Sequence, residues 1–165
     1  MNKLLLTAAV LFTALAVKAE EVPIVGNVES KCVINTDVTG VYGNPSIDKL
    51  STNSADGGVS PIIRYDVAIA DTYIARIITP TNFSQSPVLN DTLSWSGSVA
   101  TSRVSDAGMS AYDAAKVVYD ATTEFDLSIA GTTWFKADSS VTYGYGKALP
   151  GGNYRAIVQA ECIAK

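Results

Sequence analysis

The sequence predicts a mostly β fold, an antiparallel immunoglobulin-like β-sandwich with one short inserted helix. Several short segments alternate apolar and polar residues with a period of two, as half-buried strands do. Turns rich in Gly, Pro, Asn and Ser separate these segments, and a single stretch has helical spacing instead. About seven short strands with turn signals between them are typical of a sandwich formed by one domain.

The first nineteen residues have the pattern of a signal peptide rather than of a folded element. Lys3 precedes an apolar stretch from Leu4 to Val17, and Val17-Lys18-Ala19 suits cleavage after Ala19. The alternative is an N-terminal membrane anchor, although the stretch is short for spanning a bilayer. We therefore expect residues 1–19 to be removed, and the mature protein to begin at Glu20 in an exported, oxidising environment.

The predicted strands follow one another along the rest of the chain. They are Ile62–Ala70, Tyr73–Ile78, Leu93–Val104 with an interruption at Ser96-Gly97-Ser98, Phe125–Ile129, Val141–Tyr145 and Tyr154–Ile163. The last of these has the clearest alternation, because Tyr154, Ala156, Val158 and Ala160 share one face. Residues 35–60 and 79–91 are predicted to be long connections.

One stretch departs from the strand pattern. Ser110 and Asp113 resemble a capping box, and Ala111, Ala114, Ala115 and Val118 follow at helical spacing. This spacing predicts a helix of two to three turns, ending near Tyr119, inserted between strands.

Composition excludes several classes of function. The formal net charge of −4 becomes −6 when Lys3 and Lys18 leave with the leader, which disfavours nucleic acid and anionic lipid as partners. The chain has no histidine, so the usual catalytic triads and most zinc sites are excluded. Its scattered carboxylates leave an exported hydrolase as a third, weaker hypothesis. We expect no enzyme activity, no catalytic residue, no metal and no cofactor.

The sequence contains two cysteines, Cys32 and Cys162. An even number of cysteines in an exported protein favours a disulfide, with two unpaired buried thiols as the alternative. A bond between them would place the first and last elements of the domain side by side. Closing so long a loop is worth roughly 4–5 kcal/mol on the chain-entropy model.

The segment before Cys32 is the most informative one. Val22, Ile24, Gly26 and Val28 fall on one face of an extended strand. Small and apolar side chains at every second position suit a row of pockets, and such a strand can complete a sheet that lacks one.

These features together resemble the subunits of chaperone–usher fimbriae. Leu93-Ser94-Trp95-Ser96-Gly97, followed by an alanine-rich stretch, is similar to subunits of the alternate, colonisation-factor branch. Gly26-Asn27-Val28 before Cys32 is similar to the end of their donor extension, and Gly152-Asn153-Tyr154 is similar to the start of their last strand. In the best-known subunits, however, the disulfide joins the first strand to one about 40 residues later. The resemblance covers both ends of the chain and little of its middle.

The resemblance implies a domain organisation and a mechanism. Residues 20–31 would be a donor-strand extension, and residues 32–165 an immunoglobulin-like pilin domain that lacks its final strand. A periplasmic chaperone would first fill the groove beside Tyr154–Ile163, and the extension of the next subunit would then replace it during assembly at an outer-membrane usher. The product would be an adhesive surface fimbria made of such subunits, with an unknown receptor. The alternative is a self-contained secreted or periplasmic binding module, in which Val22–Val28 is the first strand of its own domain.

Overall fold

The computed structural model describes residues 23–26, 31–144 and 146–165. The predicted signal peptide, as well as Val22 and Val28 of the predicted donor strand, lies outside the described residues. The strands are β1 (Cys32–Val38), β2 (Gly43–Ser46), β3 (Lys49–Ser51), β4 (Ile62–Val67), β5 (Tyr73–Ile78), β6 (Leu93–Val104), β7 (Val117–Tyr119), β8 (Thr122–Leu127), β9 (Gly131–Tyr143) and β10 (Gln159–Ala164). The helical segments are the 3₁₀ turns Ser54–Asp56 and Ala107–Ala111 and the short helix α1 (Tyr112–Ala115).

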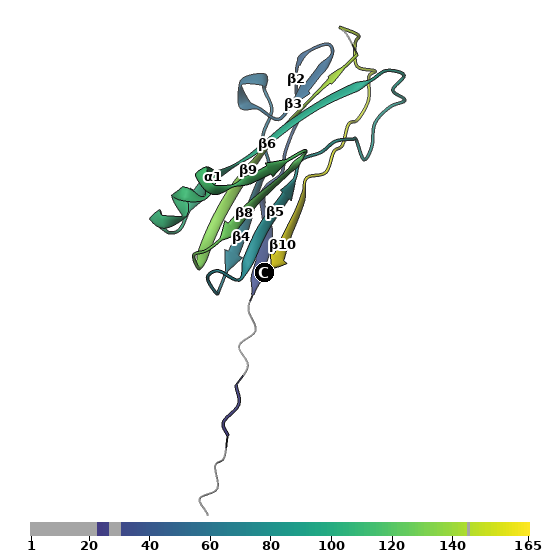
Figure 1. The fold of residues 1–165 in the computed structure, drawn as a ribbon. Coiled ribbons are helices and arrows are strands. Elements are labelled where there is room, and N and C mark those ends of the chain that lie inside the picture. The colour runs from purple at the N-terminus through teal and green to yellow at the C-terminus, as the bar shows by residue number, and fades with distance from the viewer. Residues whose placement is uncertain (1–22, 27–30, 145) are drawn as a thin grey trace, which may run out of the picture.

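The strands form two antiparallel sheets, and this confirms the predicted mostly β sandwich with one short helix (Figure 1). One sheet has the order β1-β4-β9-β3-β2, and β6 pairs along the other side of β9. The second sheet has the order β10-β5-β8-β7. Among the described strands, β1 and β10 are therefore edge strands, each with one neighbour in its sheet.

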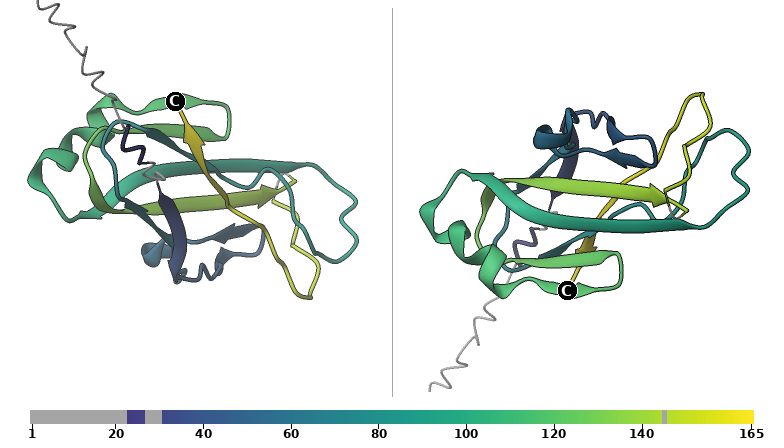
Figure 2. Two further views of the ribbon diagram at one scale, coloured as in Figure 1. Left: turned by 90° about the horizontal axis from the view of Figure 1, so that it is seen from below. Right: turned by 90° about the horizontal axis from the view of Figure 1, so that it is seen from above.

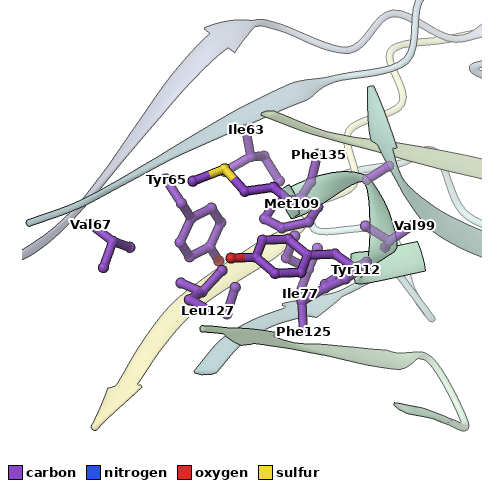
Figure 3. Packing of buried hydrophobic residues seen from close by; sticks show 12 residues of the cluster. Ile63, Tyr65, Val67, Ile77, Val99, Met109, Tyr112, Phe125, Leu127 and Phe135 are labelled. Carbon is purple, nitrogen blue, oxygen red and sulfur yellow. The ribbon is translucent and has the colours of Figure 1, made fainter. Parts of the chain in front are cut away.

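The core lies between the two sheets and is built from the inward faces of their strands (Figure 3). Phe135 lies at its centre. The ring centroid of Phe135 is 5.5 Å from that of Tyr65 in the same sheet and 4.3 Å from that of Phe125 in the opposite sheet. All three rings are fully buried. Because β4, β8 and β9 alternate buried and more exposed positions, each strand places its apolar residues on the face that meets the other sheet.

The inserted helix is shorter than predicted. Its segment starts as a 3₁₀ turn at Ala107, and Asp106 caps that turn by accepting a hydrogen bond from the amide of Gly108. The α-helix ends at Ala115, because the next residues form β7 and pair with β8 instead. The β-branched Val117 and Val118 suit a strand better than a helix, so the expected helix to Tyr119 was wrong in its last turn.

Two strands are longer than predicted. β6 runs without a break through Ser96-Gly97-Ser98, since this stretch pairs with β9 from Ser140 to Asp138. β9 begins at Gly131, ten residues before the expected strand, and its additional residues include Trp134 and Phe135. The connection predicted for residues 35–60 in fact contains most of β1 together with the short β2–β3 pair.

The last strand is shorter than predicted. It begins at Gln159 rather than Tyr154, and from there to Ala164 it pairs with β5. Residues 154–158 are extended but lie outside any strand, and only Arg155 forms an isolated bridge, with Gln85 of the 79–92 loop. Figure 2 shows this segment and that loop extending from the same end of the domain. None of the helices in the described ranges is long and apolar enough to cross a membrane.

Candidate functional site: a groove between two sheet edges

A disulfide joins the edges of the two sheets. Cys32 at the start of β1 is bonded to Cys162 in β10, and their Cα atoms are 6.3 Å apart. The predicted pairing is therefore confirmed, and the first and last strands lie side by side at this end of the domain, as Figure 1 also shows. Both cysteines pack against the hydrophobic core.

Beyond the disulfide, a groove of about 810 Å³ opens between the same two edges. One wall comes from β1 and the residues after it, through Ile34, Thr36 and the stretch from Thr39 to Tyr42. The opposite wall is the segment from Gly152 to Val158, together with Ala160. All four residues predicted for an acceptor groove line it, namely Tyr154, Ala156, Val158 and Ala160.

The alternation predicted for residues 154–160 persists where the strand itself does not. Tyr154, Ala156, Val158 and Ala160 are half-buried, and the residues between them are exposed. The 79–92 loop fixes this geometry, because the backbone of Gln85 donates to and accepts from that of Arg155, at 3.2 and 2.8 Å. The side of this segment that faces β1 has no strand beside it among the described residues.

A cluster of aromatic side chains lies at the end of the groove that is far from the disulfide. Phe83 contacts Trp95 and Tyr154, with ring centroids 4.7 and 5.0 Å apart, and Tyr42 approaches the same ring at 6.4 Å. Burial raises the pKa of Tyr42, partly offset by its hydrogen bond with Ser139, and desolvation also raises the pKa of Tyr154. Both phenols are therefore neutral at physiological pH, and the wall they form is uncharged.

The described part of the predicted donor strand makes no contact with the domain. Ile24 is 99 % exposed and Val25 is 90 % exposed. A Cβ atom built on Gly26 would meet nothing within 4 Å. Residues 23–26 form no strand, and the first described strand is β1.

The sequence did not identify the wall that faces residues 154–160. Ile34 and Thr36 alternate along β1, and this period of two could have marked the strand. Pro61 and Pro80 come from loops, and the aromatic cluster joins the loop residues Tyr42 and Phe83 to Trp95 of β6. No local pattern predicts this arrangement.

A second hollow, of about 280 Å³, lies between β3, β6 and β9 and is lined by polar residues. Its charged groups pair with one another or with neighbours: Lys49 contacts Asp56 at 3.0 Å, and Asp138 accepts a hydrogen bond from Ser60. Within the described ranges, no three His, Cys, Asp or Glu side chains gather to hold a metal ion.

Comparison with known proteins yields no relative from which a function could be transferred. No family model, no curated protein and no solved structure matches this chain. The groove and the exposed segment before Cys32 are therefore interpreted from their own geometry.

Proposed function

We propose that this protein is a structural subunit of a surface fimbria and polymerises by donor-strand exchange. In this proposal, Val22–Val28 of one subunit inserts into the groove of the next. The observation that carries the proposal is the groove itself, open between two sheet edges, in a chain whose Ile24 and Val25 are almost completely exposed. Unpaired edges and exposed apolar side chains are costly features, and strand insertion removes both at once.

The extension and the groove wall formed by residues 154–160 agree in length. Val22–Val28 and Tyr154–Ala160 are each seven residues long, which corresponds to roughly 20 Å of extended chain. Each presents four residues at every second position on one face. A strand between β1 and residues 154–160 could form backbone hydrogen bonds on both sides, although Pro23 would donate none.

The energetics favour insertion by a modest amount per residue. Burying a valine or isoleucine side chain contributes about 1.5–3 kcal/mol, before the cost of ordering the segment. The half-buried Ala156 and Ala160 leave room for larger side chains of an inserted strand, because alanine fills little of the wall. Backbone pairing along two edges adds to this contribution.

The placement of the two parts favours a filament over a closed dimer. The extension precedes Cys32, at the disulfide end of the groove, whereas the groove continues to Gly152 and Tyr42 at the other end. A contact between two different surfaces that does not close on itself generates an open chain of subunits.

The remaining parts of the proposal rest on the resemblance described above. A periplasmic chaperone would occupy the groove until the next subunit arrives, and an outer-membrane usher would carry the growing fibre to the cell surface. There the fimbria would support adhesion, without enzyme activity or a cofactor.

Two neighbouring residues of the extension provide a matched test. Ile24→Lys would place an unpaired charge in a pocket and should abolish assembly, whereas Val25→Lys faces the other side of the strand and should leave assembly intact. Both side chains are exposed in the described structure, so neither change should lower the melting temperature. Assembly is measured by light scattering at increasing protein concentration.

Deletion of residues 20–31 distinguishes the proposal from a self-contained binding module. The shortened subunit should remain folded and should bind a synthetic peptide with the sequence of residues 20–31. In a self-contained module, the same deletion removes a core strand and lowers the melting temperature. The proposal is wrong if the intact chain stays monomeric at all concentrations and the shortened chain unfolds.

A further inference from the structure

The groove and the disulfide share the same two edges. The lining starts at Ile34 on β1 and at Ala160 on β10, two residues from Cys32 and Cys162 respectively. Neither cysteine lines the groove. The bond therefore marks the position at which the groove ends.

A strand cannot pass between the two cysteines. Hydrogen-bonded strands are about 4.8 Å apart, so two edges that hold a third strand between them must be separated by roughly 9.5 Å. The Cα atoms of Cys32 and Cys162 are 6.3 Å apart, and the covalent bond prevents them from moving to that separation.

We propose that the Cys32–Cys162 disulfide is a stop that sets the register of the inserted strand. This inference rests on the proposed function and adds to it what determines where the strand comes to rest. A donor subunit continues into its own domain after Lys31, and a folded domain cannot follow the extension past the disulfide. That end of the extension therefore stays at the other end of the groove, near Tyr154. The other end of the extension then points toward the disulfide.

The stop leaves one register that uses the whole groove. With Val22 opposite Ala160, the four apolar positions of the extension align with the four lining positions, and Glu20 and Glu21 remain outside the closed end. A slip of two residues toward the disulfide is blocked by the bond. A slip of two residues away from it leaves Ala160 uncovered, and a slip of one residue turns the apolar face outward.

The first measurement uses the full chain with its disulfide intact and a ¹⁵N-labelled peptide with the sequence of residues 20–31. Amide hydrogen exchange should show protection that ends at Val22, with the amide of Glu21 exchanging as in the free peptide. Protection of the Glu21 amide would overturn the proposed stop. This measurement requires no variant of the protein.

The second measurement compares the affinities of two peptides, that of residues 20–31 and a longer one, for two forms of the protein. In the longer peptide, Val-Thr-Val-Thr replaces Glu20-Glu21 and so extends the apolar alternation of Val22 and Ile24. The disulfide-bonded chain should bind it with less than about a twofold gain in affinity. The Cys32→Ala/Cys162→Ala variant, with its edges free to separate, should bind it about fivefold more tightly or better, because a further valine becomes buried. Reduction of the natural chain should have the same effect.

The outcomes separate this inference from the proposed function. The proposed stop is wrong if the longer peptide binds the disulfide-bonded chain about fivefold more tightly than the shorter one. It is also wrong if the folded double variant binds both peptides with equal affinity. Either result leaves strand insertion itself supported. Failure of the disulfide-bonded chain to bind either peptide overturns both. If the double variant does not fold, the exchange boundary at Val22 decides the question.

Discussion

The hydroxyl of Tyr65 connects the two sheets within the core. It extends from β4 and hydrogen-bonds to the backbone carbonyl of Glu161 in β10 at 3.1 Å, with the carbonyl of Arg76 in β5 as a second acceptor at 3.3 Å. Tyr65→Phe keeps the buried ring and removes this bond, so we expect a loss of about 1 kcal/mol in the free energy of unfolding. Chemical denaturation measures this loss.

Tyr119→Phe is the matched control for that change. The hydroxyl of Tyr119 donates to the carboxylate of Glu124 at the surface, where water can replace the bond. A loss of stability as large in Tyr119→Phe as in Tyr65→Phe would contradict the role assigned to the buried hydroxyl.

The same phenol predicts how stability changes at high pH. Burial is the main cause that raises the pKa of Tyr65 above its ordinary value of 10.0. The unfolded chain therefore releases this proton at a lower pH than the folded chain does. The contribution of Tyr65 to stability is complete below pH 10 and is lost as the pH rises above that value. Urea denaturation between pH 9 and 11 should show a decline that is smaller in Tyr65→Phe, and an equal decline in both proteins would contradict this.

At the scale of single elements, Gly97 explains why β6 could not be recognised as one strand. The sequence suggested an interruption, since glycine weakens strands. In the structure, a Cβ atom on Gly97 would lie 2.4 Å from Oγ1 of Thr79, so the glycine permits a close approach of the chain that follows β5. The Thr79 hydroxyl also donates to the carbonyl of Ala121 at 3.1 Å.

Gly97→Ala should therefore destabilise the domain by about 1–3 kcal/mol, because Thr79 has to move and its hydrogen bond is disturbed. Gly151→Ala is the control, since a Cβ atom there would meet nothing within 4 Å. Thermal unfolding of both variants measures the difference. Equal melting temperatures would show that β6 adjusts without cost.

Alternation predicted an element most reliably where one face is buried by the opposite sheet. β5 has the predicted bounds, Tyr73–Ile78, because its inward residues Ala75 and Ile77 are fully buried. The helix that includes Ala114 and Ala115 failed to extend to Tyr119, since pairing with β8 outweighed the helical spacing. The start of β10 was misplaced for a similar reason, because strand pairing with β5 begins only at Gln159.

At the scale of the whole molecule, only one wall of the groove could be predicted. The alternation of Tyr154, Ala156, Val158 and Ala160 is local and visible in the sequence. The opposite wall depends on the pairing of β1 with β4 and on the disulfide, which bring residues more than a hundred positions apart to the same edge. Local patterns contain no information on such distant contacts.

The final prediction separates donating a strand from accepting one. Ile24→Lys should prevent a subunit from donating while its groove stays intact. Ala156→Lys should block the groove, because Ala156 lines it and is not among the side chains that pack against the core. Gln159→Lys is the control for the second change, since Gln159 is exposed and does not line the groove.

Each variant alone should remain monomeric, for opposite reasons. When the two are mixed in equal amounts, the intact extension of Ala156→Lys should enter the intact groove of Ile24→Lys. Growth must then stop at two subunits, because this pair has neither a free functional extension nor a free functional groove. Light scattering coupled to size-exclusion chromatography should therefore show a heterodimer and no larger species. A mixture that stays monomeric, or either variant polymerising alone, would exclude head-to-tail exchange of Val22–Val28 through this groove.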